Sequence, residues 1–296
     1  MKFFRLNLKN VAVISACFAV TAALTSCQKD GVYHPGKKIS KVYSQRPGEG
    51  KELDEIYKWD GNKLDKVTNA DGSWFMKFSY DGNRVSKITD NDGDYTVTFS
   101  YSGSKYDKIE LVAKGYNVVW KPTYKGSNII KIERTETYLG SKSNAELQEK
   151  AAILAAVELF LPVPIRENEN EAILKSAQKE RKAGNVSVET YTYTWKGSNI
   201  TKMEHEWTSS YDSKVYTSTT DYKEYDKKKN PFYGYVDEDM ISSKNNCLKE
   251  EYTSSGGSVA EYEYEYIYKG SYPTECTTTY TSGSYKGKYI TIYEYE

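Results

Sequence analysis

The chain has 296 residues, with 41 basic and 41 acidic side chains, so its net charge at neutral pH is zero. This balance argues against nucleic acid as a partner, because no global positive field is available to attract it. The 29 tyrosines and the zero net charge also argue against disorder, which needs few aromatic residues and a high net charge. The length suits one large all-β domain or two smaller ones.

The amino terminus resembles a lipoprotein export signal. Basic residues within 2–9 precede an apolar segment, Val11 to Leu24, which is too short to span a bilayer comfortably. Leu24-Thr25-Ser26-Cys27 matches the bacterial lipobox. We therefore expect residues 1–26 to be removed, Cys27 to be lipidated and residues 27–36 to form a tether. Such an anchor attaches a protein to a membrane without spanning it. An ordinary signal peptide followed by a chance cysteine is the alternative.

The residues after Cys27 bear on localisation. Gln28-Lys29-Asp30 resembles the short signal that sends lipoproteins of some Gram-negative gut commensals to the outer face of the outer membrane. We predict an outer-membrane lipoprotein exposed at the cell surface, and a periplasm-facing lipoprotein is the alternative. The rest of the chain, 37–296, is predicted to be a single β-repeat domain.

A hairpin unit recurs along that domain. Trp59, Tyr80 and Tyr101 lie 21 residues apart, and each is followed two residues later by a glycine. Because glycine accepts a positive φ cheaply, Asp-Gly and Ser-Gly ahead of an apolar run indicate a hairpin. A fixed period indicates one structural unit used repeatedly. Further units are centred on Gly126, Gly197 and Gly270, and we expect an antiparallel meander that curls into an open or closed barrel-like sheet.

Two features interrupt the regular strands. Ser143-Asn-Ala-Glu146 forms a capping box, and the helical spacing that follows predicts a two-helix insertion at about 143–183. It would plug or cap the sheet, or cover a binding cleft as a lid. Val186 and Val188 are out of phase with Tyr191, which suggests a bulge between them.

The repeats resemble known proteins. Phe78-Ser-Tyr80-Asp-Gly82 is similar to the Tyr-Asp repeats of large secreted β-shell proteins. The stretch Tyr222 to Gly234 resembles a family of uncharacterised gut-commensal lipoproteins, a domain of unknown function with a porin-like fold. This resemblance implies a barrel-like meander over about 37–296 and carries no agreed activity. Glu261, Glu263 and Glu265 alternate with tyrosines and would be costly against lipid, so we predict a water-soluble sheet or barrel.

Catalytic motifs are missing from the sequence, so we predict a protein that is not an enzyme and needs no cofactor or metal. His205 is expected to be a plain strand residue, since Glu204 and Glu206 point to the opposite face. Asp90-Asn-Asp92-Gly-Asp94 begins like a calcium loop, but the twelfth position is Tyr101 instead of the required glutamate. A hairpin turn is the better interpretation.

Cys247 and Cys276 remain after processing, in a compartment where disulfides form. Our strand map places one further strand between them, at a separation of about 9.5 Å. That exceeds the roughly 7 Å limit between Cα atoms, so the map argues against a bond.

Aromatic side chains are the remaining candidates for function. Sugars stack on exposed rings, and Trp195, Tyr193, Tyr264 and Tyr266 are the predicted ligand-binding residues. Rings that only form the core are the alternative. The leading hypothesis is a surface protein that binds a glycan or other polymer. A structural or adhesive envelope protein with protein partners is second, and a glycosidase-like enzyme is third.

Overall fold

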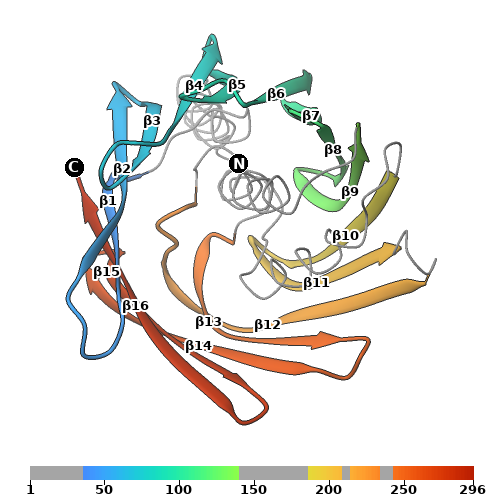
Figure 1. The fold of residues 1–296 in the computed structure, drawn as a ribbon. Helices are drawn as coiled ribbons and strands as arrows, with labels where there is room; N and C mark the ends of the chain where they lie inside the picture. The colour runs from blue at the N-terminus through green and yellow to red at the C-terminus, as the bar shows by residue number, and fades with distance from the viewer. Residues whose placement is uncertain (1–35, 140–185, 209–213, 234–242) are drawn as a thin grey trace, which may run out of the picture.

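Sixteen antiparallel strands close into a barrel in the computed structural model, which describes residues 36–139, 186–208, 214–233 and 243–296 (Figure 1). The first nine strands are β1 (Ile39–Gln45), β2 (Glu52–Asp60), β3 (Lys63–Asn69), β4 (Phe75–Asp81), β5 (Arg84–Asp90), β6 (Tyr95–Ser102), β7 (Lys105–Ala113), β8 (Tyr116–Lys125) and β9 (Asn128–Tyr138). The other seven are β10 (Val186–Lys196), β11 (Asn199–Thr208), β12 (Val215–Lys229), β13 (Asn245–Ser254), β14 (Val259–Lys269), β15 (Tyr272–Ser282) and β16 (Tyr285–Tyr295).

The fold class expected from the sequence needs correction. The described residues form strands and turns without a helix, and the sheet is closed. The two-helix insertion expected at 143–183 lies outside the described residues, so the helices assigned to the fold class are not seen. Its capping box is a local signal, whereas β9 and β10 pair directly, with Val186 opposite Thr137. The sheet therefore continues across the insertion without any element from it. The all-β antiparallel meander is confirmed.

The prediction of a bulge between Val188 and Tyr191 is wrong. Pairing between β9 and β10 runs without a shift from Val186 to Thr192. The two valines lie on the face opposite Tyr191, where they are 50% and 44% exposed. Nothing in the described residues is a helix long and apolar enough to cross a membrane.

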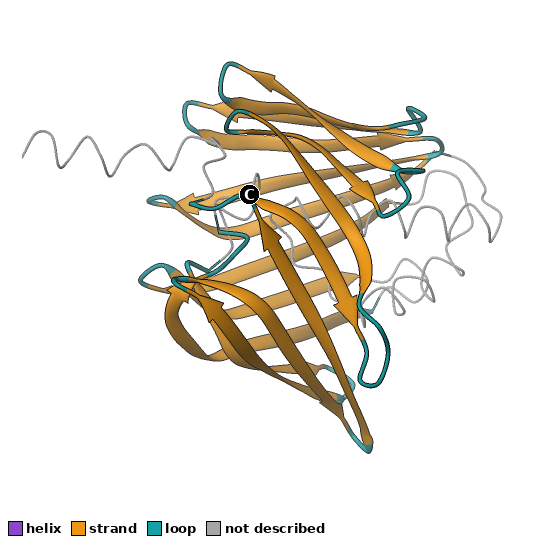
Figure 2. Cartoon of the chain, turned by 90° about the vertical axis from the view of Figure 1, so that its left-hand side faces the viewer, coloured by secondary structure: helices purple, strands orange, loops and turns teal. Residues whose placement is uncertain are grey.

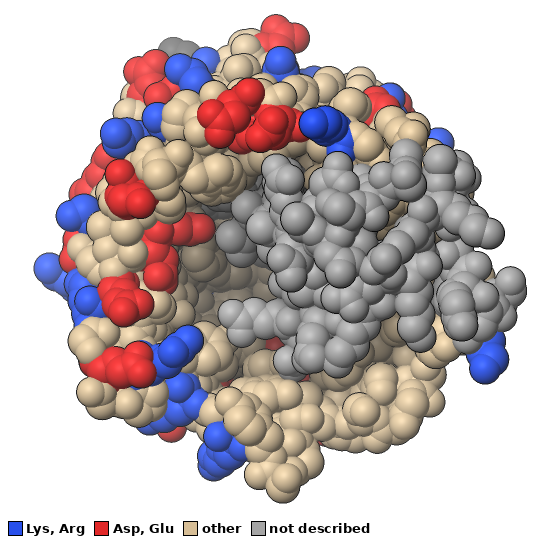
Figure 3. Space-filling view, viewed as in Figure 1, with Lys and Arg blue, Asp and Glu red and all other residues tan. Residues whose placement is uncertain are grey.

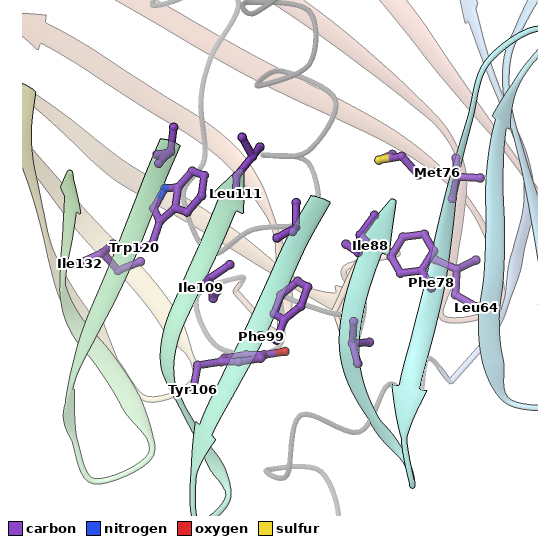
Figure 4. Close-up of a cluster of buried hydrophobic side chains, with 14 of the residues drawn as sticks. Leu64, Met76, Phe78, Ile88, Phe99, Tyr106, Ile109, Leu111, Trp120 and Ile132 are labelled. Atoms are coloured by element: carbon purple, nitrogen blue, oxygen red, sulfur yellow. The ribbon is translucent and has the colours of Figure 1, made fainter. Parts of the chain in front are cut away.

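Side chains alternate between the inside and the outside of the barrel, because neighbouring residues of a strand point to opposite faces. From β3 to β9 the inward positions are mostly apolar and covered, and Figure 4 shows this cluster. Leu64, Met76, Ile88 and Ile109 are each 0% exposed, and full burial of such a side chain contributes about 1.5–3 kcal/mol. The outer positions carry charged residues, which form exposed ion pairs such as Lys77–Asp65, Lys108–Glu110 and Lys131–Glu133.

The two ends of the barrel differ in their turns, and Figure 2 shows both ends from the side. At one end, two-residue loops join even-numbered strands to the next strand, at 61–62, 82–83, 103–104, 126–127, 197–198 and 270–271. We call this end the latched rim. The barrel also begins and finishes there, with the Glu296 amide donating to the Lys38 carbonyl at 3.0 Å. The other end, the open rim, carries turns at 46–51, 70–74, 91–94, 114–115, 255–258 and 283–284.

Candidate functional site

At seven positions around the latched rim, an aromatic side chain links one strand or hairpin to the preceding one. In every case a Trp or Tyr donates its ring N–H or hydroxyl to a backbone carbonyl three residues after a glycine. The donor–acceptor pairs are Trp59–Ile39 (2.8 Å), Tyr80–Leu64 (2.8 Å), Tyr101–Val85 (2.6 Å), Tyr124–Tyr106 (3.2 Å), Trp195–Ile129 (2.7 Å), Tyr225–Ile200 (2.6 Å) and Tyr295–Pro273 (2.7 Å). We call this contact the aromatic latch.

The latch exists because neighbouring hairpins stop pairing before they reach the rim. Between β3 and β4 the ladder ends at Lys66 and Lys77, two residues before Leu64. Its carbonyl would lack a strand partner, and a buried carbonyl without a hydrogen bond is costly. The Tyr80 hydroxyl supplies that hydrogen bond.

A bulge follows each of these glycines. Opposite Lys58 and Trp59 the register skips Asp65, so one residue is left unpaired as in other β-bulges. The same skip falls four residues after the glycine in five further hairpins, at Ser86, Asp107, Ile130, Thr201 and Thr274. The repeat that is visible in the sequence therefore encodes a loop, a bulge and a latch together.

Basic side chains add a second link between neighbouring hairpins. Lys63 donates to the Gly82 carbonyl at 2.6 Å, and its ammonium lies 5.3 Å from the centroid of the Tyr80 ring. Arg84 repeats this arrangement with Gly103 and Tyr101. The equivalent contacts are Lys38 to Gly61 over Trp59 and Lys105 to Gly126 over Tyr124. Cations are thereby held along this part of the latched rim.

Trp195 and Tyr193, two predicted ligand-binding residues, lie together on β10 and are used in packing. The Trp195 indole N–H is engaged by the Ile129 carbonyl, and its ring packs against the core. Tyr193 is 3% exposed. Trp195 is half-buried.

Tyr264 and Tyr266, the other two predicted residues, lie on a different wall. On β13 to β16 the inward positions are mostly tyrosine, threonine and glutamate, with few aliphatic residues. Six of these inward tyrosines form what we call the tyrosine wall: Tyr252, Tyr262, Tyr264, Tyr266, Tyr280 and Tyr289. Five of them are half-buried, and Tyr289 is 40% exposed.

The exposure of Tyr289 shows that the barrel interior is open on this side. Tyr289 pairs with Thr278, which shares its face with Tyr262 and Tyr280 through the β14–β15 register. Figure 3 shows a hollow at the mouth of the open rim, beside the part of the wall formed by β1, β2, β15 and β16 (compare Figure 1). The tyrosine wall and this hollow together are the candidate binding site.

Neighbouring carboxylates hold the rings of this wall. The Tyr264 hydroxyl donates to Glu250 at 2.6 Å, and Glu250 itself is 4% exposed. Toward the latched rim, Tyr268 donates to Asp226, which also accepts from the Asn246 side chain at 3.0 Å. Ring centroids of Tyr264 and Tyr266 are 6.5 Å apart, in a stacked arrangement. Burial raises the pKa of Tyr266, so its phenol stays a hydrogen-bond donor at neutral pH.

Two thiols lie on strands of the wall. Cys247 on β13 and Cys276 on β15 are not joined by a disulfide, and β14 lies between their strands. This order confirms the strand map drawn from the sequence. Burial raises the pKa of Cys276 to about 11, so this thiol is protonated and unreactive at neutral pH.

A buried ion cluster joins β9, β10 and β11. Arg134, 1% exposed, pairs with Glu189 at 2.9 Å and with Glu136 at 3.2 Å. Glu189 also accepts from the Tyr191 hydroxyl at 2.9 Å and lies 3.5 Å from His205. Desolvation opposes its ionisation, but Arg134, His205 and Tyr191 together lower the pKa of Glu189 to about 2. The cluster therefore holds an ionised glutamate in the barrel at β10, away from the tyrosine wall.

His205 is consequently more than a plain strand residue. Glu204 and Glu206 are exposed on the other face, as predicted, while His205 itself is 8% exposed. Its ring stacks on Tyr191 at 4.2 Å and on Trp207 at 4.7 Å between centroids. This arrangement could not be predicted from the sequence, because Glu189 and Tyr191 come from the neighbouring strand.

The acidic stretch 90–94 forms a turn, as predicted. Asp90 accepts from the Tyr95 amide at 3.3 Å and Asn91 accepts from the Phe75 amide at 3.2 Å. Gly93 has a φ of 74°. Within the described ranges, no three His, Cys, Asp or Glu side chains gather in a way that would hold a metal ion.

Charge is distributed unevenly between the two rims. Basic residues of the latched rim are Lys37, Lys38, Lys63, Arg84, Lys105, Lys125, Lys196, Lys229, Lys244 and Lys269, against Asp60, Asp81 and Glu296. The sequence adds Asp237, Glu238 and Asp239 between β12 and β13, outside the described residues. Acidic residues of the open rim are Glu49, Glu52, Asp71, Asp90, Asp92 and Asp94, against Arg46, Lys51, Lys114 and Lys214. Figure 3 shows acidic side chains at the open rim near β4–β6.

Comparison with known proteins supports the architecture. No protein-family model and no curated protein matches the chain. A porin-like protein from Bacteroides vulgatus ATCC 8482 matches with a TM-score of 0.51 and 13% identity, over 88% of this chain and 99% of that chain. A porin-like protein from Bacteroides uniformis ATCC 8492 has a TM-score of 0.35 and 8% identity, over 90% and 100%. The first similarity shows a shared fold, so the porin-like fold implied by the sequence resemblance is confirmed.

Proposed function

We propose that the protein is a cell-envelope lipoprotein, anchored through Cys27 at the cell surface, whose barrel binds a glycan against the tyrosine wall. It acts by binding and performs no catalysis. The observation that carries this proposal is the half-open wall itself, where inward rings such as Tyr289 remain exposed. Exposed rings that border a hollow offer stacking faces, and their hydroxyls offer hydrogen bonds.

The charged outer face supports an aqueous position for the barrel. Glu261 and Glu263 on β14 pair with Lys249 at 3.8 Å and 3.3 Å, and all three side chains are exposed. A barrel that crosses a bilayer needs an apolar outer band on its strands. The lipid at Cys27 then provides the membrane attachment.

Removing rings from the wall tests the binding proposal. Glycans that bind the purified lipoprotein on an array would be measured again by calorimetry with the double variant Tyr264→Ala, Tyr266→Ala. Loss of two stacking faces, each worth about 0.5–1.5 kcal/mol, is expected to weaken binding by about 10-fold or more. Glu265→Ala, on the outer face of the same strand, is the matched control and should bind normally. Unchanged affinity in a folded double variant contradicts the proposal.

A second candidate function is an adhesive protein that binds other envelope proteins. It is favoured by exposed aliphatic side chains around the open rim, among them Val186, Val215 and Val259 at 50%, 58% and 47% exposure. Exposed apolar residues that cluster mark interaction surfaces. Crosslinking to one envelope protein, lost in Val186→Ser, Val215→Ser and unaffected by the ring variants, would favour this candidate.

A further inference from the structure

We propose that the latched rim faces the phosphate-bearing headgroups of the membrane that holds the lipid anchor, so that the open rim and its hollow point away from it. This orientation rests on the lipidation of Cys27 proposed above. Two independent observations support it: the point at which the chain enters the barrel, and the charge of the rim it enters.

The chain enters the barrel at the latched rim. Lys38 donates to the Gly61 carbonyl of the first hairpin loop, and its own carbonyl accepts from Glu296. The segment between Cys27 and Lys37 is residues 28–36, which reaches about 30 Å when fully extended. An 11-residue strand rises by about 36 Å, so this tether is too short to follow the wall to the open rim and still leave slack. The anchor therefore keeps the latched rim near the bilayer.

The charge of that rim suits an anionic surface. Lys63, Arg84 and Lys105 are held at successive hairpins by their contacts to glycine carbonyls. Lys125 and Lys196 end β8 and β10 with exposed side chains. Basic side chains next to a lipid surface are attracted to anionic headgroups within about one Debye length. Cations spread around a circumference meet a flat surface together, whereas a linear acidic chain contacts a subset of them.

The test measures how far each rim lies from the bilayer. The mature lipoprotein is incorporated into vesicles of phosphatidylcholine alone or with phosphatidylglycerol added. A fluorophore is attached at Asn62→Cys on the latched rim or at Ser284→Cys on the open rim, each in a Cys247→Ser background, and a headgroup-linked quencher reports proximity. We expect quenching at position 62 to rise severalfold with phosphatidylglycerol and to fall with added salt, while position 284 stays unquenched.

Charge-reversal variants distinguish the effect of the rim's positive charge from the effect of the lipid anchor. Lys125→Glu with Lys196→Glu should abolish the phosphatidylglycerol-dependent quenching at position 62, and Lys114→Glu on the open rim should leave it unchanged. Neither lysine of the double variant belongs to the cationic contacts described above, so folding is preserved.

Each other outcome decides between the proposals. Attachment to phosphatidylcholine vesicles, with quenching that ignores lipid charge, overturns the orientation and leaves the anchor intact. Failure to attach to either vesicle overturns both. Attachment only to vesicles that contain phosphatidylglycerol supports the contact between the rim and the headgroups but contradicts the proposed lipid anchor at Cys27. If dextran sulfate abolishes the quenching at position 62 while lipid is in large excess, the latched rim binds an acidic glycan instead, and the orientation is overturned.

Discussion

Single side chains at the latched rim have effects that their half-exposed positions would not suggest. Tyr80 is bonded through its hydroxyl to the Leu64 carbonyl, and Leu64 is 0% exposed. The ring contributes packing and the hydroxyl completes the ladder. A change that removes the hydroxyl alone therefore isolates the latch.

We expect Tyr80→Phe to lower the free energy of unfolding by about 1–3 kcal/mol, because the Leu64 carbonyl loses its partner while the ring stays in place. Urea unfolding followed by fluorescence measures the change. Tyr285→Phe is the matched control, since Tyr285 is 65% exposed and should change stability by less than about 0.5 kcal/mol. Equal effects in the two variants would mean that the latch contributes nothing.

The hairpin is the element that the sequence repeat specifies, and its glycine is the most constrained position. Gly103 has a φ of 62°, and a Cβ there would meet nothing within 4 Å. The cost of substitution is therefore purely conformational. Two-residue hairpin loops need a positive φ that residues with a Cβ adopt at a cost of about 1–2 kcal/mol.

Gly103→Ala should accordingly destabilise the barrel by about 1 kcal/mol and lower its melting temperature by a few degrees, measured by calorimetry. Gly50→Ala provides the control, because Gly50 also has open space around it but no positive φ. A destabilised Gly50→Ala with an unaffected Gly103→Ala would refute the conformational account.

Sequence reasoning succeeded where the signal is local. Glycine spacing identified the hairpins at Gly61, Gly82 and Gly103, and alternation assigned the two faces of β14. It missed contacts whose partner lies on another strand: the repeat displays the aromatic residue and the glycine, but does not reveal that the ring donates to a carbonyl of the preceding hairpin. The bond from the Trp195 indole N–H to the Ile129 carbonyl is one such contact.

At the scale of the whole molecule, closure and the ion cluster could not be read from the sequence. The β16–β1 ladder joins residues about 250 positions apart, such as Tyr293 and Val42, and local periodicity says nothing about such a pairing. The cluster of Arg134 and Glu189 joins β9 to β10 in the same way, and His205 adds β11. It ties the acid stability of the barrel to one buried carboxylate.

Glu189 should make the barrel sensitive to acid. Its pKa is lowered from 4.5 to about 2 in the folded state, so its contribution to stability is complete above about pH 5 and is lost as the pH falls toward 2. Glu189→Gln should remove much of this pH dependence. It should also cost about 3–5 kcal/mol at pH 7, because Arg134 loses a buried partner.

Urea unfolding at pH 7, 4 and 3 measures both effects. Glu204→Gln is the control, because Glu204 pairs with Lys202 on the exposed face, where an ion pair contributes about 0–1 kcal/mol. A wild-type barrel whose stability is constant between pH 7 and pH 3 would exclude the role given to Glu189.

The aromatic latches all run in one direction along the chain. Each donor comes later than its acceptor, from Trp59 reaching back to Ile39 through Tyr295 reaching back to Pro273. In a chain that emerges amino end first, each of these acceptors is therefore present before its donor. Each latched hairpin can dock on a strand that lies earlier in the chain, and only the seam between β1 and β16 needs the last residues.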